Sequence, residues 1–124
     1  MGHSFANEPP AGFAVEQRLA VYGSLAPGEA NAHILEPLSG SWCAGTVRGT
    51  LHAAGWAAEL GYRAIRLDPV APEVPVRLFT SPDLPALWEE LDAFEGEEYE
   101  REPTPVRVGN TTVEAFLYQA RERA

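Results

Sequence analysis

The sequence predicts an α+β domain with a curled, mostly antiparallel sheet and one principal helix. Runs with strand character outnumber helical ones, and the longest helical pattern covers residues 82–95. Strands and helices do not alternate regularly, which argues against a parallel, doubly wound sheet. The pair Gly109-Asn110 separates two strand-like runs, as the turn of a β-hairpin does.

The length and composition are typical of one globular domain. The chain has 124 residues, of which 45% are hydrophobic, and this length suffices to bury a core. We expect a flexible N-terminal arm at residues 1–17, a single domain at residues 18–120 and a polar C-terminal tail at residues 121–124.

Charge and cysteine content argue against several classes of protein. The net charge is −9 and all nine basic residues are arginines, which disfavours nucleic acid and anionic lipid as partners. No apolar run approaches the roughly 20 residues of a membrane helix, and residues 1–10 do not resemble a signal peptide. Cys43 is the only cysteine, which fits a cytoplasmic location. Between Trp42 and Ala44 it is predicted to be a plain buried thiol rather than a nucleophile.

The first elements are a buried strand and a short helix. Residues 19–22 read as a strand that ends in a loop rich in glycine and proline at residues 23–28. A short helix is expected over residues 30–35 and should stop before Pro37.

Two further strands are expected in the middle of the chain. Residues 42–52 have strand character, and Gly45 and Gly49 within them suggest bends or bulges. A loop at residues 53–61 leads to a strand at residues 62–67.

The remaining strands show the period of two that a half-buried strand requires. Apolar residues alternate over residues 74–79, where Pro75 implies an edge position or an irregular start. The same alternation at residues 104–108, followed by Gly109 and a strand at residues 112–119, predicts the hairpin.

The helix between these strands places one acid on an apolar face. With Ser81 as N-cap and Pro82 at the first position, the apolar residues fall within an arc of about 120°. They are Leu84, Leu87, Trp88, Leu91 and Phe94. Glu95 lies about 20° from Leu84 and about 40° from Leu91 in the same projection. Glu95 therefore extends from the apolar stripe, which is unfavourable unless a partner or chemistry compensates.

Two interpretations of Glu95 remain open on this evidence. In one, the helix ends at Gly96, and Glu95 pairs with an arginine or reaches solvent. In the other, Glu95 is half-buried against Trp88, Phe94 or Tyr99, so desolvation raises its pKa and suits it to general acid/base catalysis.

The loop after the first buried strand is a second candidate site. It begins with Tyr22, Gly23, Ser24 and Leu25. Glycine allows close approach of a ligand, and successive N–H groups in such a turn can bind a carboxylate or an oxyanion. An ordinary turn from strand to loop is the alternative.

Other constellations predict no further site. His3, His33 and His52 lack the spacing of metal ligands, so no metal is expected. Ser24 is not in a nucleophile elbow, and no phosphate-binding glycine motif is present, so no cofactor is expected. The remaining acids near the helix end are predicted to form a solvated patch. They are Glu97, Glu98, Glu100 and Glu102.

Taken together and in order, these motifs resemble the gamma-glutamylcyclotransferase-like (AIG2-like) family. The matching stretches are Tyr22-Gly23-Ser24-Leu25, Gly61-Tyr62-x-Ala64-Ile65, residues 74–80, Leu91-Asp92-Ala93-Phe94-Glu95-Gly96, Tyr99-x-Arg101 and Ala115-Phe116-Leu117-Tyr118. The resemblance covers roughly residues 19–118. The chain departs from the family pattern at Arg63, where proline is frequent, and at Val76, where glycine is frequent.

The resemblance implies a small α+β domain with a mixed, barrel-like sheet. It implies an enzyme, independent of metal, that releases an amine from a small γ-glutamyl compound and forms 5-oxoproline. Glu95 would be the acid/base, and residues 22–25 the substrate-binding loop. Tyr22, Tyr99 and Tyr118 would be pocket walls, although each fits a core position equally well.

Neither the leaving group nor catalysis itself follows from the resemblance alone. Glutathione-like, dipeptide and protein-derived amines all fit the reaction. A non-catalytic domain that binds a small carboxylate on the same fold is the alternative, because a fold does not fix a function.

Overall fold

The structure is a computed structural model that describes residues 3–22, 27–29, 31–53 and 63–121. Its strands are β1 (His3–Phe5), β2 (Arg18–Val21), β3 (Gly40–Ala53), β4 (Arg63–Leu67), β5 (Glu73–Thr80), β6 (Tyr99–Val108) and β7 (Thr111–Ala120). One α-helix, α1 (Trp88–Glu95), and the 3-10 helices η1 (Val15–Gln17), η2 (Ala32–Ile34) and η4 (Leu84–Ala86) complete the described elements.

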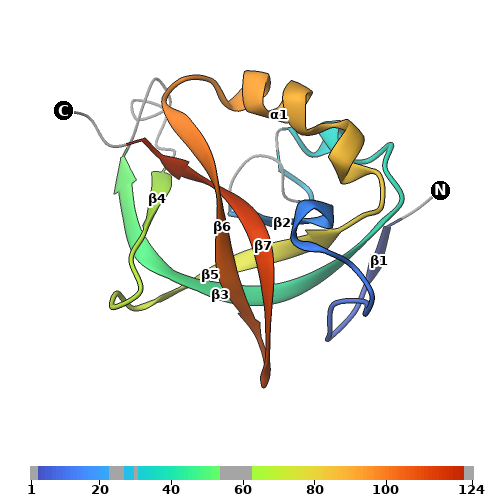
Figure 1. Cartoon of the computed structure of the whole chain (residues 1–124), viewed down its shortest axis with the longest axis horizontal. Helices are drawn as coiled ribbons and strands as arrows, with labels where there is room; N and C mark the ends of the chain where they lie inside the picture. Colours follow the sequence, from blue (N-terminus) through green and yellow to red (C-terminus); the bar gives the residue numbers. More distant parts are fainter. Residues whose placement is uncertain (1–2, 23–26, 30, 54–62, 122–124) are drawn as a thin grey trace.

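Five of the described strands close into a barrel. They follow the order β3, β5, β2, β7 and β6, and β6 returns to β3 through the pair Thr46–Arg107. In Figure 1 the β6–β7 hairpin crosses over β3 and β5. Within the described sheet, only β1–β3 and β2–β7 are parallel pairs. The prediction of a small mixed, mostly antiparallel, barrel-like sheet with one principal helix is therefore confirmed.

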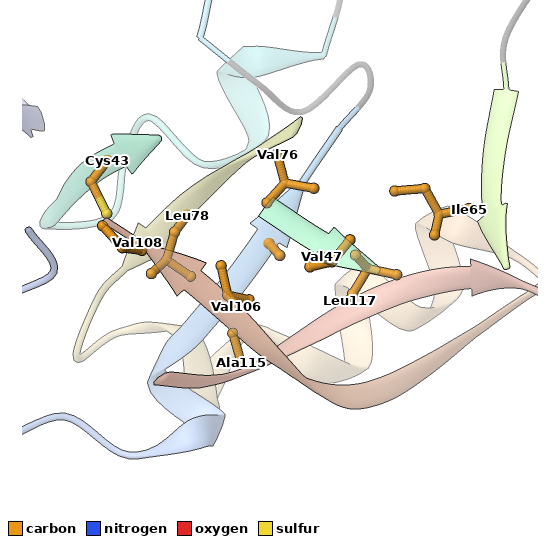
Figure 2. Packing of buried hydrophobic residues seen from close by; sticks show 10 residues of the cluster. Cys43, Val47, Ile65, Val76, Leu78, Val106, Val108, Ala115 and Leu117 are labelled. Carbon is orange, nitrogen blue, oxygen red and sulfur yellow. The ribbon is translucent and has the colours of Figure 1, made fainter. Parts of the chain in front are cut away.

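Successive side chains along the barrel strands point alternately into two cores, because side chains in a strand alternate between its two faces. On β2, Ala20 packs with the interior cluster, whereas Leu19 and Val21 pack with α1 and its surroundings. Figure 2 shows the interior side chains converging from the barrel strands, with Ile65 of β4 beside them. Cys43 belongs to this cluster and is buried, and burial raises its pKa, which agrees with the prediction of a plain buried thiol.

Of the bends or bulges expected at Gly45 and Gly49, no bulge is found in the ladders that contain these glycines. The β3–β5 register runs without interruption from Ser41–Thr80 to Arg48–Glu73. A Cβ atom on Gly45 would lie 2.9 Å from Cγ1 of Val106, and one on Gly49 would lie 2.6 Å from the carbonyl oxygen of Arg66. These glycines are needed because neighbouring strands approach β3 closely.

Pro75 lies in the half of β5 that has β3 as its only partner strand among the described residues. β2 pairs with β5 only from Arg77 to Thr80. An imide without an N–H is tolerated there, because no second ladder requires the donor.

The principal helix begins later than predicted. Residues 81–87 form a turn and η4, and α1 starts at Trp88. Pro85 explains the delay, because inside a helix it lacks the N–H donor and clashes with the carbonyl of Ser81. Ser81 instead accepts a hydrogen bond from the N–H of Asp83 (3.0 Å). The end of the helix is as predicted: Gly96 follows Glu95 with a φ of 84°.

The first 17 residues contain β1 and η1, where a flexible arm was expected. The indole N–H of Trp42 donates to Nδ1 of His3 (2.9 Å), and Nε2 of His3 lies 3.0 Å from the carbonyl oxygen of Leu38. Because that carbonyl only accepts, Nε2 carries the hydrogen. These bonds hold β1 against β3, so the arm has tertiary contacts.

The predicted short helix at residues 30–35 is the 3-10 helix η2. At the C-terminus, the side chain of Arg121 binds the carbonyl oxygens of Glu97 and Tyr99 (2.9 and 3.3 Å). Arg121 therefore continues the fold beyond β7, although it was assigned to the polar tail.

Candidate functional site

α1 lies across one side of the barrel (Figure 1), and Glu95 is its last residue. Trp88 and Leu91 are buried under the helix. Each buried apolar side chain of this size contributes about 1.5–3 kcal/mol, so the helix is held firmly by its apolar face. Phe94, predicted for the same face, is 41% exposed instead. Glu95 itself is half-buried.

The carboxyl group of Glu95 has an unusual acidity. Burial raises its pKa from the ordinary 4.5 to about 7, because desolvation disfavours the charged form. No hydrogen bond or ion pair of its carboxylate is found among the described residues. A carboxyl that titrates near neutrality is able both to accept and to release a proton at physiological pH.

Three tyrosines lie close enough to this carboxyl for its charge to affect their pKa values. Burial is the main cause that raises the pKa values of Tyr22, Tyr99 and Tyr118, and the negative charge of Glu95 adds to the rise in each. They come from the end of β2, the start of β6 and the end of β7. The topology thus brings Glu95 together with two of the predicted binding residues, Tyr22 and Tyr99, and with Tyr118.

Tyr22 is fixed by its hydroxyl group. It donates to the carbonyl oxygen of Tyr118 (2.6 Å) and accepts from the N–H of Ile65 (3.1 Å). The phenol therefore links β7 to β4 at the end of β2. Tyr22 is therefore held in place by two strands beside the site.

The rest of the predicted binding loop cannot be placed. Gly23, Ser24 and Leu25 lie outside the described residues. Their proposed contact with a substrate therefore rests on the sequence motif and on the position of Tyr22 immediately before them.

Arg101 pairs with Asp92 and not with Glu95. Nε and one terminal nitrogen of Arg101 donate to the two carboxylate oxygens of Asp92 (2.9 and 3.1 Å). The hydroxyl of Tyr118 donates to Oδ1 of Asp92 (2.6 Å). The hydrogen bond from Arg101 is the main cause that lowers the pKa of Asp92. Arg101 is therefore bound to Asp92 and does not hold Glu95 as a structural partner.

Two carboxyl groups one helical turn apart thus have pKa values shifted in opposite directions. Asp92 stays ionised, whereas Glu95 titrates near pH 7. Separation of this kind is the usual arrangement by which a site assigns different tasks to two acids. Asp92 was not among the site residues predicted from the sequence. Its spacing of four residues from Trp88 and three from Glu95 was the available signal.

A hollow of about 620 Å³ adjoins Asp92, Tyr99 and Tyr118, whereas Glu95 is not among the residues that line it. It is lined by Asp92, Ala93, Gly96, Glu97, Tyr99, Glu100, Arg101, Glu102, Tyr118 and Arg121. Of the acids predicted to form a solvated patch, Glu97 is exposed, while Glu98, Glu100 and Glu102 are half-buried. Glu100 forms an ion pair with Arg121 (3.6 Å), so this group is more structured than a solvated patch.

The described part of the chain brings together no three side chains of His, Cys, Asp or Glu that could hold a metal ion. Nor does any helix found there have the length and apolar character needed to cross a membrane.

Comparison with known proteins places the chain in context. A family model described as gamma-glutamyl cyclotransferase, AIG2-like, matches residues 19–124. The chain is similar to the crystal structure of an AIG2-like protein from Mus musculus, with a TM-score of 0.68 and 20% identity over 87% of this chain and 79% of that one. It is also similar to YkqA from Bacillus subtilis, with a TM-score of 0.66 and 21% identity over 85% of this chain.

The match spans only 36% of the YkqA chain. At these identities the two structures support the fold and nothing finer. None of the curated proteins that were compared matches the chain.

Proposed function

This chain belongs to the AIG2-like gamma-glutamyl cyclotransferase family, and we propose that it releases an amine from a γ-glutamyl compound and forms 5-oxoproline, with Glu95 as general acid/base. The observation that carries the proposal is the carboxyl of Glu95, half-buried among three tyrosines with a pKa of about 7. The reaction needs one proton carrier and no protein nucleophile, because the substrate supplies its own amine.

The proton transfers follow from this pKa. The α-ammonium group of the substrate loses a proton to ionised Glu95. The neutral amine attacks the γ-carbonyl carbon and forms the new C–N bond of a five-membered lactam. The old C–N bond then breaks as protonated Glu95 returns this proton to the departing nitrogen. Glu95, ionised again, takes the second proton from the ring nitrogen and passes it to the released amine, so that the products are the neutral lactam and an ammonium ion. A substrate held in a folded conformation makes this step intramolecular, which lowers its barrier.

The tyrosines have separate tasks in this proposal. The hydroxyls of Tyr22 and Tyr118 are committed to protein groups, so these residues form walls that exclude water from Glu95. The hydroxyl of Tyr99 has no partner among the described residues, and in this proposal it binds substrate. Main-chain N–H groups of Gly23, Ser24 and Leu25 would hold the α-carboxylate or the developing oxyanion.

The proposal also includes the bounds of the catalytic domain and the cellular compartment of the protein. A single catalytic domain at residues 18–120 contains all of these groups. The buried, unpaired thiol of Cys43 is suited to a reducing compartment, so we place the protein in the cytoplasm.

The test is turnover of a panel of γ-glutamyl amines and dipeptides, with 5-oxoproline as the measured product. Glu95→Gln keeps the shape of the side chain but removes the base, and it should lower kcat about 10²- to 10⁴-fold. Glu97→Gln, an exposed acid two residues further on, is the matched control and should keep full activity. Equal turnover by Glu95→Gln and the parent would show that the assigned mechanism is wrong.

The same panel separates the enzyme from a binding domain. A non-catalytic domain for a small carboxylate would be stabilised against heat by γ-glutamyl compounds while releasing no 5-oxoproline.

A further inference from the structure

The final turn of α1 is tied to the barrel by one cluster of side chains. Arg101 of β6 and Tyr118 of β7 are direct cross-strand partners, and both bind the carboxylate of Asp92. The guanidinium group of Arg101 also lies over the rings of Trp88 (4.5 Å) and Phe116 (4.6 Å). Arg101 therefore has a fixed place between the helix and the hairpin.

We propose that Asp92 is a positioning residue, which with Arg101 and Tyr118 fixes the last turn of α1 and keeps the guanidinium group away from Glu95. The inference rests on the proposed function, because it explains how Glu95 stays available as the proton carrier. Asp92 itself takes no part in the proton transfers.

The geometry makes Asp92 and Glu95 competitors for one cation. Residues three apart on a helix are neighbours on its surface, with Cβ atoms about 5–6 Å apart. Tyr118 links the two acids, because its hydroxyl binds Asp92 while its own ionisation is opposed by the charge of Glu95. A guanidinium group released from Asp92 would therefore lie within reach of Glu95. Pairing with it would hold Glu95 ionised and leave it unable to donate a proton.

Several elements supply the titratable and charged groups near Glu95. Among the described residues, the charge of Glu95 acts on Tyr22 after β2, Tyr99 on β6 and Tyr118 on β7. Asp92 and Arg101 act in turn on Tyr118, and Glu98 acts on Tyr99. Arg101 is the one cation of this set, and its two directed hydrogen bonds to Asp92 decide which acid it neutralises.

The test is an NMR titration of the ¹³C-labelled carboxyl of Glu95 in the full chain without substrate, assigned with Glu95→Gln. Asn has the shape of Asp and keeps an acceptor for Tyr118, but it removes the negative charge. Asp92→Asn should lower the titration midpoint of Glu95 by about one pH unit, because Arg101 is released and becomes available to pair with Glu95.

Arg101→Gln provides the opposite perturbation. It removes the cation and leaves Asp92 charged, so the midpoint of Glu95 should rise. If the cluster only held the helix in place, both variants would expose Glu95 and lower its midpoint toward 4.5. Arg101→Met, whose thioether packs on the two rings, replaces the Gln variant if the latter does not fold.

Matched controls come from an exposed ion pair elsewhere on the barrel, Arg107 with Glu73 (3.4 Å). Glu73→Gln and Arg107→Gln should leave the midpoint of Glu95 unchanged. An unchanged or raised midpoint in Asp92→Asn, or a lowered midpoint in the Arg101 variant, would overturn the proposal. Because the titration needs no substrate, absence of turnover would refute the proposed function and leave this result intact.

Discussion

Glu95 should make the folded protein less stable as the pH rises. Its pKa is about 7 in the folded protein and 4.5 in an ordinary environment, so the folded state holds the proton more tightly than the unfolded chain. Below pH 4.5 both states are protonated and the burial has no consequence. Above pH 7 both are ionised, and the folded state carries the full penalty of a desolvated charge.

The size of the effect follows from the shift. At 1.36 kcal/mol per unit, a rise from 4.5 to about 7 corresponds to about 3 kcal/mol at high pH. Between pH 5.5 and pH 8.5 the penalty grows by about 2 kcal/mol, because at pH 5.5 the unfolded chain is already ionised and the folded protein is not. Glu95→Gln removes this titration. It should therefore raise the free energy of unfolding at pH 8.5 by about 2 kcal/mol more than at pH 5.5.

Urea denaturation of the parent and of Glu95→Gln at both pH values measures the difference. The exposed Glu97→Gln is the control and should change the free energy of unfolding by less than about 0.5 kcal/mol at either pH. If Glu95→Gln changes stability by the same amount at both pH values, the carboxyl is not desolvated in the folded protein. The physical basis for its role in proton transfer would then be lost.

Two further predictions concern the framework of the barrel. His3→Phe leaves the indole N–H of Trp42 without its acceptor, and Trp42 is only 2% exposed, so the free energy of unfolding measured by urea denaturation should fall by about 1–3 kcal/mol. The control is Phe5→Ala, at a residue that is 66% exposed, which should change the free energy of unfolding by less than about 0.5 kcal/mol. Equal effects of the two substitutions would mean that β1 is not held through His3. Gly49→Ala puts a Cβ 2.6 Å from the carbonyl oxygen of Arg66, so the melting temperature should fall, with a loss of about 1–3 kcal/mol from overpacking. Gly109→Asn is the control for Gly49→Ala and should be tolerated, because asparagine accepts the φ of 59° and the space around this position is open. If Gly49→Ala is tolerated as well, the close approach of β3 and β4 is contradicted.

Local sequence patterns were sufficient to predict the individual strands and the helix but not the closure of the strands into a barrel. The alternation at residues 104–108 and the turn at Gly109 predicted the hairpin β6–β7, because both signals are local. The pair Thr46–Arg107, which closes the barrel, joins residues far apart in the sequence. Gly45 carried the relevant signal, but a strand glycine indicates either a bulge or a close approach, and only the tertiary structure distinguishes the two.

For α1, helical periodicity predicted the last turn correctly but not the residue at which the helix begins. Its start was wrong because Pro85 outweighs the cap formed by Ser81 and Pro82. The position of Glu95 relative to Leu91 was right, because only the last turn, which is helical, enters that comparison. Phe94 is on the predicted arc but 41% exposed, since hydrophobicity alone does not supply a neighbour to pack against.

Helix periodicity alone was unable to assign different tasks to Asp92 and Glu95. Both acids are near the apolar stripe, and Arg101 lies beyond the helix end, so the sequence allows either pairing. The choice is made by the barrel: the cross-strand pair Arg101–Tyr118 presents a cation and a hydroxyl together, and Asp92 binds both. An acid that binds Arg101 cannot also be a proton carrier near pH 7, because the pairing lowers its pKa. The position of one guanidinium group thus keeps Asp92 ionised, while burial raises the pKa of Glu95.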